Sequence, residues 1–262
     1  MKRKMGHILL GVALINFIMM LWLFGCTNFM IKKPPTIVNP TDNFQSEIKD
    51  PINNFVFLIK ELKIDNECIV NREGNCDAMV LSTASGLVLS ADDQSVTILT
   101  AAHFCEASTP RLDIFPLKPT IIGIAADSPR ELQIIGADYE NDLCLLKGYK
   151  YNDEVFSPIK FPKHLPKIGE EVVAVAAPNG IGANGIKLVF DGRFAGCNSE
   201  YCMFTIPATF GSSGGGIYDS KGNLISIVMA VTQGFENLVI SPTHDDLKEF
   251  ILKIDESIDI YQ

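Results

Sequence analysis

The chain has 262 residues, of which 47% are hydrophobic and 20% are charged. This length suits one large all-β domain or two small domains. The formal net charge of −9 argues against a nucleic-acid partner, because phosphate binding requires a basic surface. The sequence contains no zinc-ligand spacing and no nucleotide-binding glycine motif, so we expect neither a metal ion nor a cofactor.

The N-terminal residues 1–26 have the pattern of a signal or a membrane anchor. Basic residues at positions 2–4 precede the uncharged stretch "ILLGVALINFIMMLWLFG" (residues 8–25). Its length lies between that of a signal-peptide core and that of a spanning helix. Three interpretations therefore stay open: an uncleaved anchor with its basic end in the cytoplasm, a lipoprotein signal, and simple secretion. The lipoprotein interpretation rests on "LFGC", which resembles a lipobox ending at Cys26. All three interpretations place the main domain on the exported side of the membrane, periplasmic or extracellular.

Six further cysteines permit a disulfide framework in an exported domain. Cys197 and Cys202 flank "NSEY", a plausible hairpin tip, and are the pair that we expect most. Cys68 and Cys76 flank "IVNREGN" in a similar way. The last two cysteines either pair or remain buried thiols, which are common in protein cores: Cys105 and Cys144.

The remaining chain is expected to consist of a linker and a β-rich domain, 52–262. Residues 27–51 contain four prolines and little periodicity, which indicates a linker. Residues 52–64 are predicted to form a short helix or a strand packed on the main domain. From Cys68 onward, short β-rich runs recur at spacings typical of barrels and sandwiches. These runs lie at 78–90, 95–104, 120–126, 132–137, 142–148, 171–178, 186–196, 203–208 and 223–231.

The period of the apolar residues changes near the C-terminus. In "SPTHDDLKEFILKIDESI" (241–258), five apolar residues fall on one helical face: Leu247, Phe250, Ile251, Ile254 and Ile258. Thr243 is a candidate N-cap, and acidic residues follow in the first turn. The sequence therefore predicts an all-β fold with a terminal helix.

Three polar residues stand where nucleophilic catalysis could use them. His103 ends an apolar run in "LTAAHFC", Asp142 directly precedes one in "YENDLCLLKG", and Ser213 lies in "GSSGGG". Taken singly, each has a plain structural interpretation: a hydrogen-bonded histidine, a turn carboxylate and a flexible glycine loop. Together they have the chemistry of a serine whose proton is taken by an imidazole that a carboxylate orients.

The stretches "TAAH", "DLCLL" and "GSSGG", in this order, resemble the chymotrypsin-fold serine proteases, especially the compact bacterial trypsin-like type. The resemblance covers roughly residues 76–254. It implies two six-stranded antiparallel β-barrels with a C-terminal helix. It also implies a catalytic triad of His103, Asp142 and Ser213, and an oxyanion hole formed by the N–H groups of Gly211 and Ser213.

The resemblance implies a serine endopeptidase that hydrolyses peptides or unfolded proteins through an acyl-enzyme, without a cofactor. Two other functions remain open. One is a catalytically inactive member of the same fold that acts as a binding or scaffolding protein at the cell envelope. The other is a membrane-anchored adhesion or envelope protein in which the glycine-rich turn is only structural.

The residues expected to bind substrate also follow from the resemblance. The primary pocket of the family is built from the chain before the nucleophile, here Pro207 and Ala208, and from the strand after it. In this sequence that strand contributes Met229, Ala230 and Val231. Relatives that cleave after Lys or Arg carry an Asp six residues before the serine, where this chain has Pro207. An apolar pocket penalises an unpaired lysine ammonium and favours a small or medium apolar P1 residue such as Val, Ala or Leu.

Overall fold

A computed structural model describes residues 49–62, 79–106, 119–125, 127–182, 186–232, 234–254 and 258. The predictions for residues 1–26, for most of the linker at 27–51 and for the Cys68–Cys76 pair lie outside these ranges. Within them, no helix is long and apolar enough to cross a membrane.

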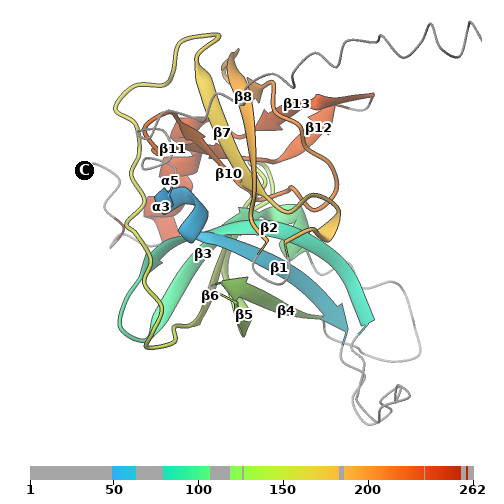
Figure 1. Cartoon of the computed structure of the whole chain (residues 1–262), viewed down its shortest axis with the longest axis vertical. Helices are drawn as coiled ribbons and strands as arrows, with labels where there is room; N and C mark the ends of the chain where they lie inside the picture. Colours follow the sequence, from blue (N-terminus) through green and yellow to red (C-terminus); the bar gives the residue numbers. More distant parts are fainter. Residues whose placement is uncertain are drawn as a thin grey trace, which may run out of the picture. The chain divides into compact units, whose positions relative to one another are not determined.

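The first half of the described chain forms a closed antiparallel barrel with the strand order β1-β2-β3-β6-β5-β4, which occupies the lower part of Figure 1. The short helix α3 (Lys49–Asn53) precedes the barrel, and one turn of helix, α4 (Ala102–Cys105), follows β3. The strands are β1 (Phe55–Leu62), β2 (Met79–Ala91), β3 (Ser95–Ala101), β4 (Pro119–Ala125), β5 (Ser128–Asp138) and β6 (Leu143–Tyr149).

Strand β1 shows why the sequence left a helix and a strand open for residues 52–64. Successive side chains of a strand point to opposite faces. Phe55 and Phe57 pack in the apolar cluster that the barrel shares with the second sheet, whereas Val56 and Leu58 pack inside the barrel. Both faces of β1 are therefore buried, and its apolar run lacks the alternation that marks a half-exposed strand.

The second half forms a seven-stranded antiparallel sheet with the order β11-β10-β7-β8-β9-β13-β12. This open sheet differs from the second closed six-stranded barrel that the resemblance implied.

The predicted strand at 223–231 breaks in two, because Val228 N–H bonds to Gly215 O while Met229 N–H bonds to Ile240 O. The two pieces become opposite edges of the sheet. The elements are β7 (Glu171–Ala176), η2 (Pro178–Gly180), β8 (Leu188–Cys197), β9 (Cys202–Phe204), β10 (Gly216–Asp219), β11 (Leu224–Ile227), β12 (Ala230–Thr232) and β13 (Phe235–Ser241).

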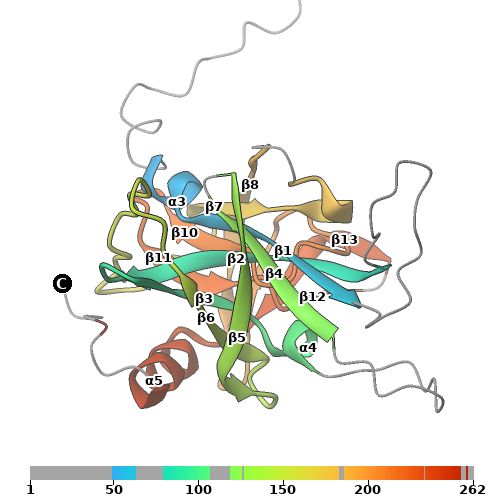
Figure 2. The same cartoon turned by 90° about the horizontal axis from the view of Figure 1, so that it is seen from below.

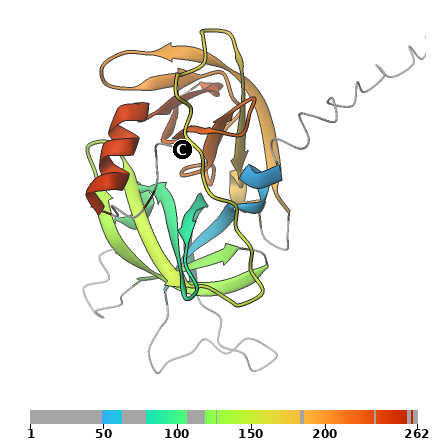
Figure 3. The same ribbon diagram turned by 90° about the vertical axis from the view of Figure 1, so that its left-hand side faces the viewer.

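The predicted terminal helix is confirmed as α5 (His244–Ile254). The Thr243 hydroxyl accepts a hydrogen bond from Asp246 N–H at 3.1 Å, which is the expected N-cap interaction. The apolar face packs against β5, β6 and β11, so the helix runs beside both sheets (Figure 3). Figure 2 shows α4 and α5 on either side of β5.

Two disulfides join described residues. Cys197–Cys202 closes the β8–β9 hairpin, as the sequence predicted. Cys105–Cys144 is also formed, and it joins α4 to β6. This second bridge decides between the two alternatives that the sequence left open.

Candidate active site

His103 and Asp142 meet at the ends of two paired barrel strands. Strands β3 and β6 are in register up to Ala101 and Leu143, so the residues just beyond β3 and just before β6 are neighbours. His103 Nδ1 lies 2.8 Å from Asp142 Oδ2, and His103 N–H donates to Asp142 Oδ1 at 2.8 Å. One carboxylate thus holds both the ring and the backbone of His103.

This pairing leaves the other ring nitrogen available. With Nδ1–H donating to Asp142, the neutral imidazole of His103 carries its lone pair on Nε2, where it can accept a proton. The His103 side chain is 50% exposed, whereas that of Asp142 is 15% exposed. The imidazole is therefore accessible to solvent and could act as a base, while the carboxylate that binds its Nδ1 is mostly buried.

The carbonyl groups of residues 210–213 all accept hydrogen bonds. The donors, in the order of these acceptors, are Asn179 N–H (2.6 Å), the Ser85 hydroxyl (2.8 Å), Gly215 N–H (2.9 Å) and Ser85 N–H (2.8 Å). Four consecutive peptide groups are therefore fixed in orientation through their oxygen atoms.

The N–H groups of residues 211–214 alternate between free and bonded. Two of them donate to backbone carbonyls: Ser212 to Thr209 (2.9 Å) and Gly214 to Val228 (2.7 Å). The N–H groups of Gly211 and Ser213 donate no hydrogen bond to any residue that the structure describes. A rigid loop with two unbonded donors, two residues apart, can bind an oxyanion at that place.

The glycines of this loop are required by its geometry. Gly211 and Gly214 have φ values of +87° and +83°, a region that other residues rarely adopt. A Cβ atom on Gly214 would also lie 2.2 Å from Ser85 O and 2.3 Å from Thr100 Oγ1. The close contact with Thr100 places the loop against β3, three residues before His103.

Ser213 is half-buried, and its hydroxyl makes no hydrogen bond within the described ranges. The structure therefore pairs His103 with Asp142 and brings the Ser213 loop against the strand that leads to His103. It does not contain a hydrogen bond between Ser213 and His103. Such contacts are often long in the absence of substrate.

The residues predicted to bind substrate differ in exposure. Pro207 and Ala230 are exposed, Met229 and Val231 are half-buried, and Ala208 is buried. Ala230 and Val231 lie on the edge strand β12, which pairs with β13 in the described sheet. Val239 is not among the residues predicted from the sequence. It pairs with Val231 and is fully buried in the same apolar cluster as Ala208.

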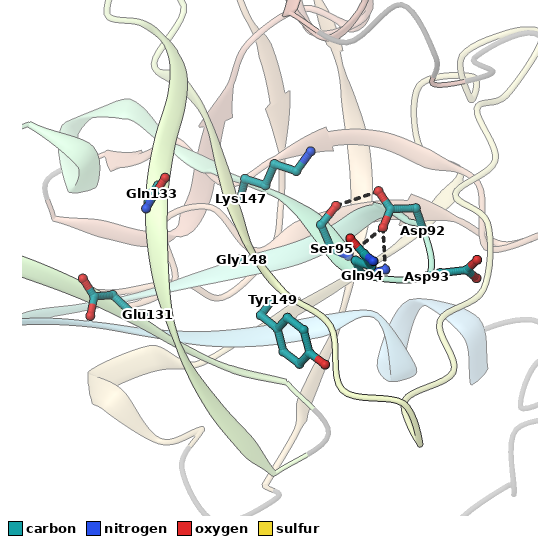
Figure 4. A pocket seen from close by; sticks show the side chains of 9 residues that line it. All are labelled: Asp92, Asp93, Gln94, Ser95, Glu131, Gln133, Lys147, Gly148 and Tyr149. Atoms are coloured by element: carbon teal, nitrogen blue, oxygen red, sulfur yellow. Dashed lines mark hydrogen bonds between the residues drawn. The ribbon is translucent and has the colours of Figure 1, made fainter.

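Two cavities lie away from these residues. One, of about 850 Å³, is lined by the β2–β3 turn and by parts of β5 and β6 (Figure 4). None of the residues predicted to form the site lines it. Its Asp92 accepts bonds from the Ser95 hydroxyl and from two backbone N–H groups, which lower the pKa of this carboxyl to about 2 and make it part of the turn. The other, of about 870 Å³, lies between the turn that precedes Asp142 and α5.

Comparisons with known proteins agree with this geometry. Residues 84–227 match the family model of the trypsin-like peptidase domain. The chain belongs to this family of chymotrypsin-fold serine proteases. A comparison with curated proteins gave no significant match.

The fold is also similar to solved protease structures. The serine endoprotease from Yersinia pestis is 18% identical, with a TM-score of 0.60 over 83% of this chain and 68% of the other. The active form of the Rv3671c protease from M. tuberculosis is 17% identical, with a TM-score of 0.58 over 84% of this chain and 87% of the other. At sequence identities of 17% and 18%, these similarities show that the fold is shared.

Proposed function

We propose that this chain is a serine endopeptidase with His103, Asp142 and Ser213 as its catalytic triad. The observation that carries the proposal is the loop at 211–215, in which only the N–H groups predicted to form the oxyanion hole, those of Gly211 and Ser213, lack an acceptor among the described residues. The His103–Asp142 hydrogen bond and membership of a peptidase family support it.

The chemistry begins with proton transfer, because a neutral hydroxyl is a weak nucleophile. His103 Nε2 takes the Ser213 proton as the serine oxygen bonds to the substrate carbonyl carbon. The negative charge on the carbonyl oxygen is stabilised by the two free N–H groups, an effect worth about 3–4 kcal/mol per donor. His103 then gives its proton to the leaving amine, and the C–N bond breaks.

The resulting acyl-enzyme is hydrolysed by the same groups. A water molecule gives its proton to His103 Nε2 and its oxygen attacks the ester carbon. Collapse of this intermediate breaks the bond to Ser213, which recovers its proton from His103. Throughout, Asp142 keeps the Nδ1 proton in place and stabilises the imidazolium that forms.

An inactive binding or scaffolding protein is the second candidate. The observation in its favour is that the Ser213 hydroxyl makes no hydrogen bond to His103. Hydrolysis of an unfolded protein such as casein distinguishes the two functions. The proposed enzyme cleaves it, and Ser213→Ala or His103→Ala lowers the rate by about 10⁴–10⁶. A scaffolding protein binds casein without cleaving it, and then neither substitution changes the result.

A further inference from the structure

Ser85 on β2 contacts the loop that contains Gly211 and Ser213 with both its backbone and its side chain. Its side chain and backbone are fully buried. Its N–H donates to Ser213 O at 2.8 Å, and its hydroxyl donates to Gly211 O at 2.8 Å. One residue of the first barrel therefore holds two carbonyls of the loop that carries the proposed nucleophile.

The remaining polar groups of Ser85 are also satisfied. Its Oγ accepts a hydrogen bond from Ala177 N–H at 2.8 Å, just after β7. Its carbonyl accepts one from the Thr100 hydroxyl at 2.7 Å, near the end of β3. Ser85 thus joins the barrel that carries His103 to the second sheet and to the loop. Because all four groups are used, its side chain has one orientation in which every bond is made.

The positions of the two bonded carbonyls matter for the oxyanion hole. A peptide group is planar, so fixing its oxygen fixes the whole unit. The unit that joins Gly211 to Ser212 lies between the two units that carry the free N–H groups. If it rotates, the direction of the Gly211 N–H relative to that of the Ser213 N–H changes. Ser85 holds this unit directly and also holds the unit after Ser213.

We propose that Ser85 is a positioning residue that keeps the two N–H donors of the oxyanion hole convergent. It touches no substrate and transfers no proton. The inference rests on the proposed peptidase function. Without the hydroxyl, the Gly211 carbonyl loses its donor and the Ala177 N–H loses its acceptor, so the loop can reorient while the His103–Asp142 pair stays intact.

The test compares Ser85→Ala with the matched variant Ser226→Ala. Ser226 on β11 is also fully buried, and its hydroxyl donates to a single backbone carbonyl, Pro242 O, at 2.8 Å. We expect Ser85→Ala to lower kcat by roughly 10- to 100-fold with little change in KM, since donors displaced by a fraction of an ångström stabilise the transition state less. The pH profile should keep its shape because the base is unchanged. Ser226→Ala should keep a kcat close to that of the unmodified protein.

Hydrogen–deuterium exchange provides a readout that does not depend on activity. The hydrogen-bonded N–H groups of residues 208–216 should exchange faster in Ser85→Ala than in Ser226→Ala. The comparison is made under conditions in which the two variants have the same free energy of unfolding. Unchanged exchange in this segment, or an equal kcat in the two variants, overturns the role of Ser85. If the unmodified protein hydrolyses nothing, the proposed function fails, and the exchange comparison alone decides whether Ser85 holds the loop.

Discussion

Asp142 carries three hydrogen bonds in a backbone conformation that non-glycine residues rarely adopt. Its φ is +55°, and this left-handed conformation costs a non-glycine residue about 1–3 kcal/mol. Its carbonyl accepts Ala102 N–H at 3.1 Å, and its carboxylate accepts both N–H groups of His103. The bonds offset the strain. Asp142 ends a turn, and its conformation places one carboxylate on both the backbone and the ring of His103.

His244 gives a prediction for the pH dependence of stability. Its Nδ1 lies 2.7 Å from Ile225 O, and its Nε2 is buried. Burial lowers the pKa of His244 below its ordinary 6.5, and the nearby Lys248 acts in the same direction, while the backbone hydrogen bonds at Ile225 and Pro162 and the charge of Asp245 act against it. As the pH is lowered, His244 is therefore protonated at a higher pH in the unfolded chain than in the folded chain.

The sign follows from this order of protonation. The contribution of neutral His244 to stability is fully present above pH 6.5 and is lost as the pH falls toward the lower folded pKa. We expect the free energy of unfolding, measured with urea, to fall by up to about 1.4 kcal/mol per pH unit in this window. His244→Gln should show a smaller fall. An equal fall in both proteins would contradict this assignment.

At the scale of elements, the disulfide Cys105–Cys144 joins the two segments that hold the proposed base and its carboxylate. Cys105 lies two residues after His103, the proposed base, and Cys144 lies two residues after Asp142. The bridge spans 39 residues, whereas Cys197–Cys202 spans 5. A longer closed loop restricts the unfolded chain more.

Replacing each pair of cysteines by alanine should therefore have unequal effects. Loss of Cys105–Cys144 should lower the free energy of unfolding by about 4 kcal/mol, and loss of Cys197–Cys202 by about 2 kcal/mol. Chemical denaturation of the two double variants under oxidising conditions measures the difference. A larger loss for the β8–β9 bridge would show that chain entropy does not control the effect.

The β12–β13 pair leads to a prediction of specificity. Val239 on β13 packs with Ala208 and Val228, and Val231 lies against them. The side chains of this cluster are apolar, so burying an unpaired ammonium among them would be strongly unfavourable. A small or medium apolar side chain instead gains about 1–3 kcal/mol from burial.

Cleavage of a mixed peptide library should occur mainly after Val, Ala or Leu. The variant Val239→Ala, which removes two methyl groups from the cluster, should shift cleavage toward larger apolar residues. Predominant cleavage after Lys or Arg would contradict the apolar pocket.

At the scale of the whole molecule, local patterns predicted the elements that are buried in a regular way. The runs at 95–104 and 142–148 and the helix after Thr243 correspond to β3, β6 and α5. Strand β5 begins earlier than the predicted run, because residues 128–131 pair with β4. This part contains Arg130, which is buried in an ion pair with Glu154 that the sequence does not reveal.

The loop geometry could not be predicted for a similar reason. The partners of the Ser85 side chain lie 92 and 126 residues away along the chain, so no local pattern marks this serine. Strand β13 was also missed. The resemblance identified the three triad candidates, but it did not indicate which residues hold them or that the second sheet stays open.

We also propose that the protein acts on the exported side of a membrane, held by residues 1–26 or by a lipid on Cys26. The basic start and the uncharged stretch that follows it support this location. In intact spheroplasts, an added protease should degrade the domain after residue 52. Full protection of the domain while the inner membrane stays sealed would contradict the proposed location.

The most direct test of the central claim is covalent labelling with a fluorophosphonate, followed by mass mapping of the modified residue. A nucleophile activated by His103 and supported by the oxyanion hole should carry the phosphonyl group on Ser213. His103→Ala should prevent the labelling, and Ser212→Ala should leave it in place. An unlabelled protein, or a label on Ser212 instead of Ser213, would contradict the account of this chain as a serine peptidase with Ser213 as its nucleophile.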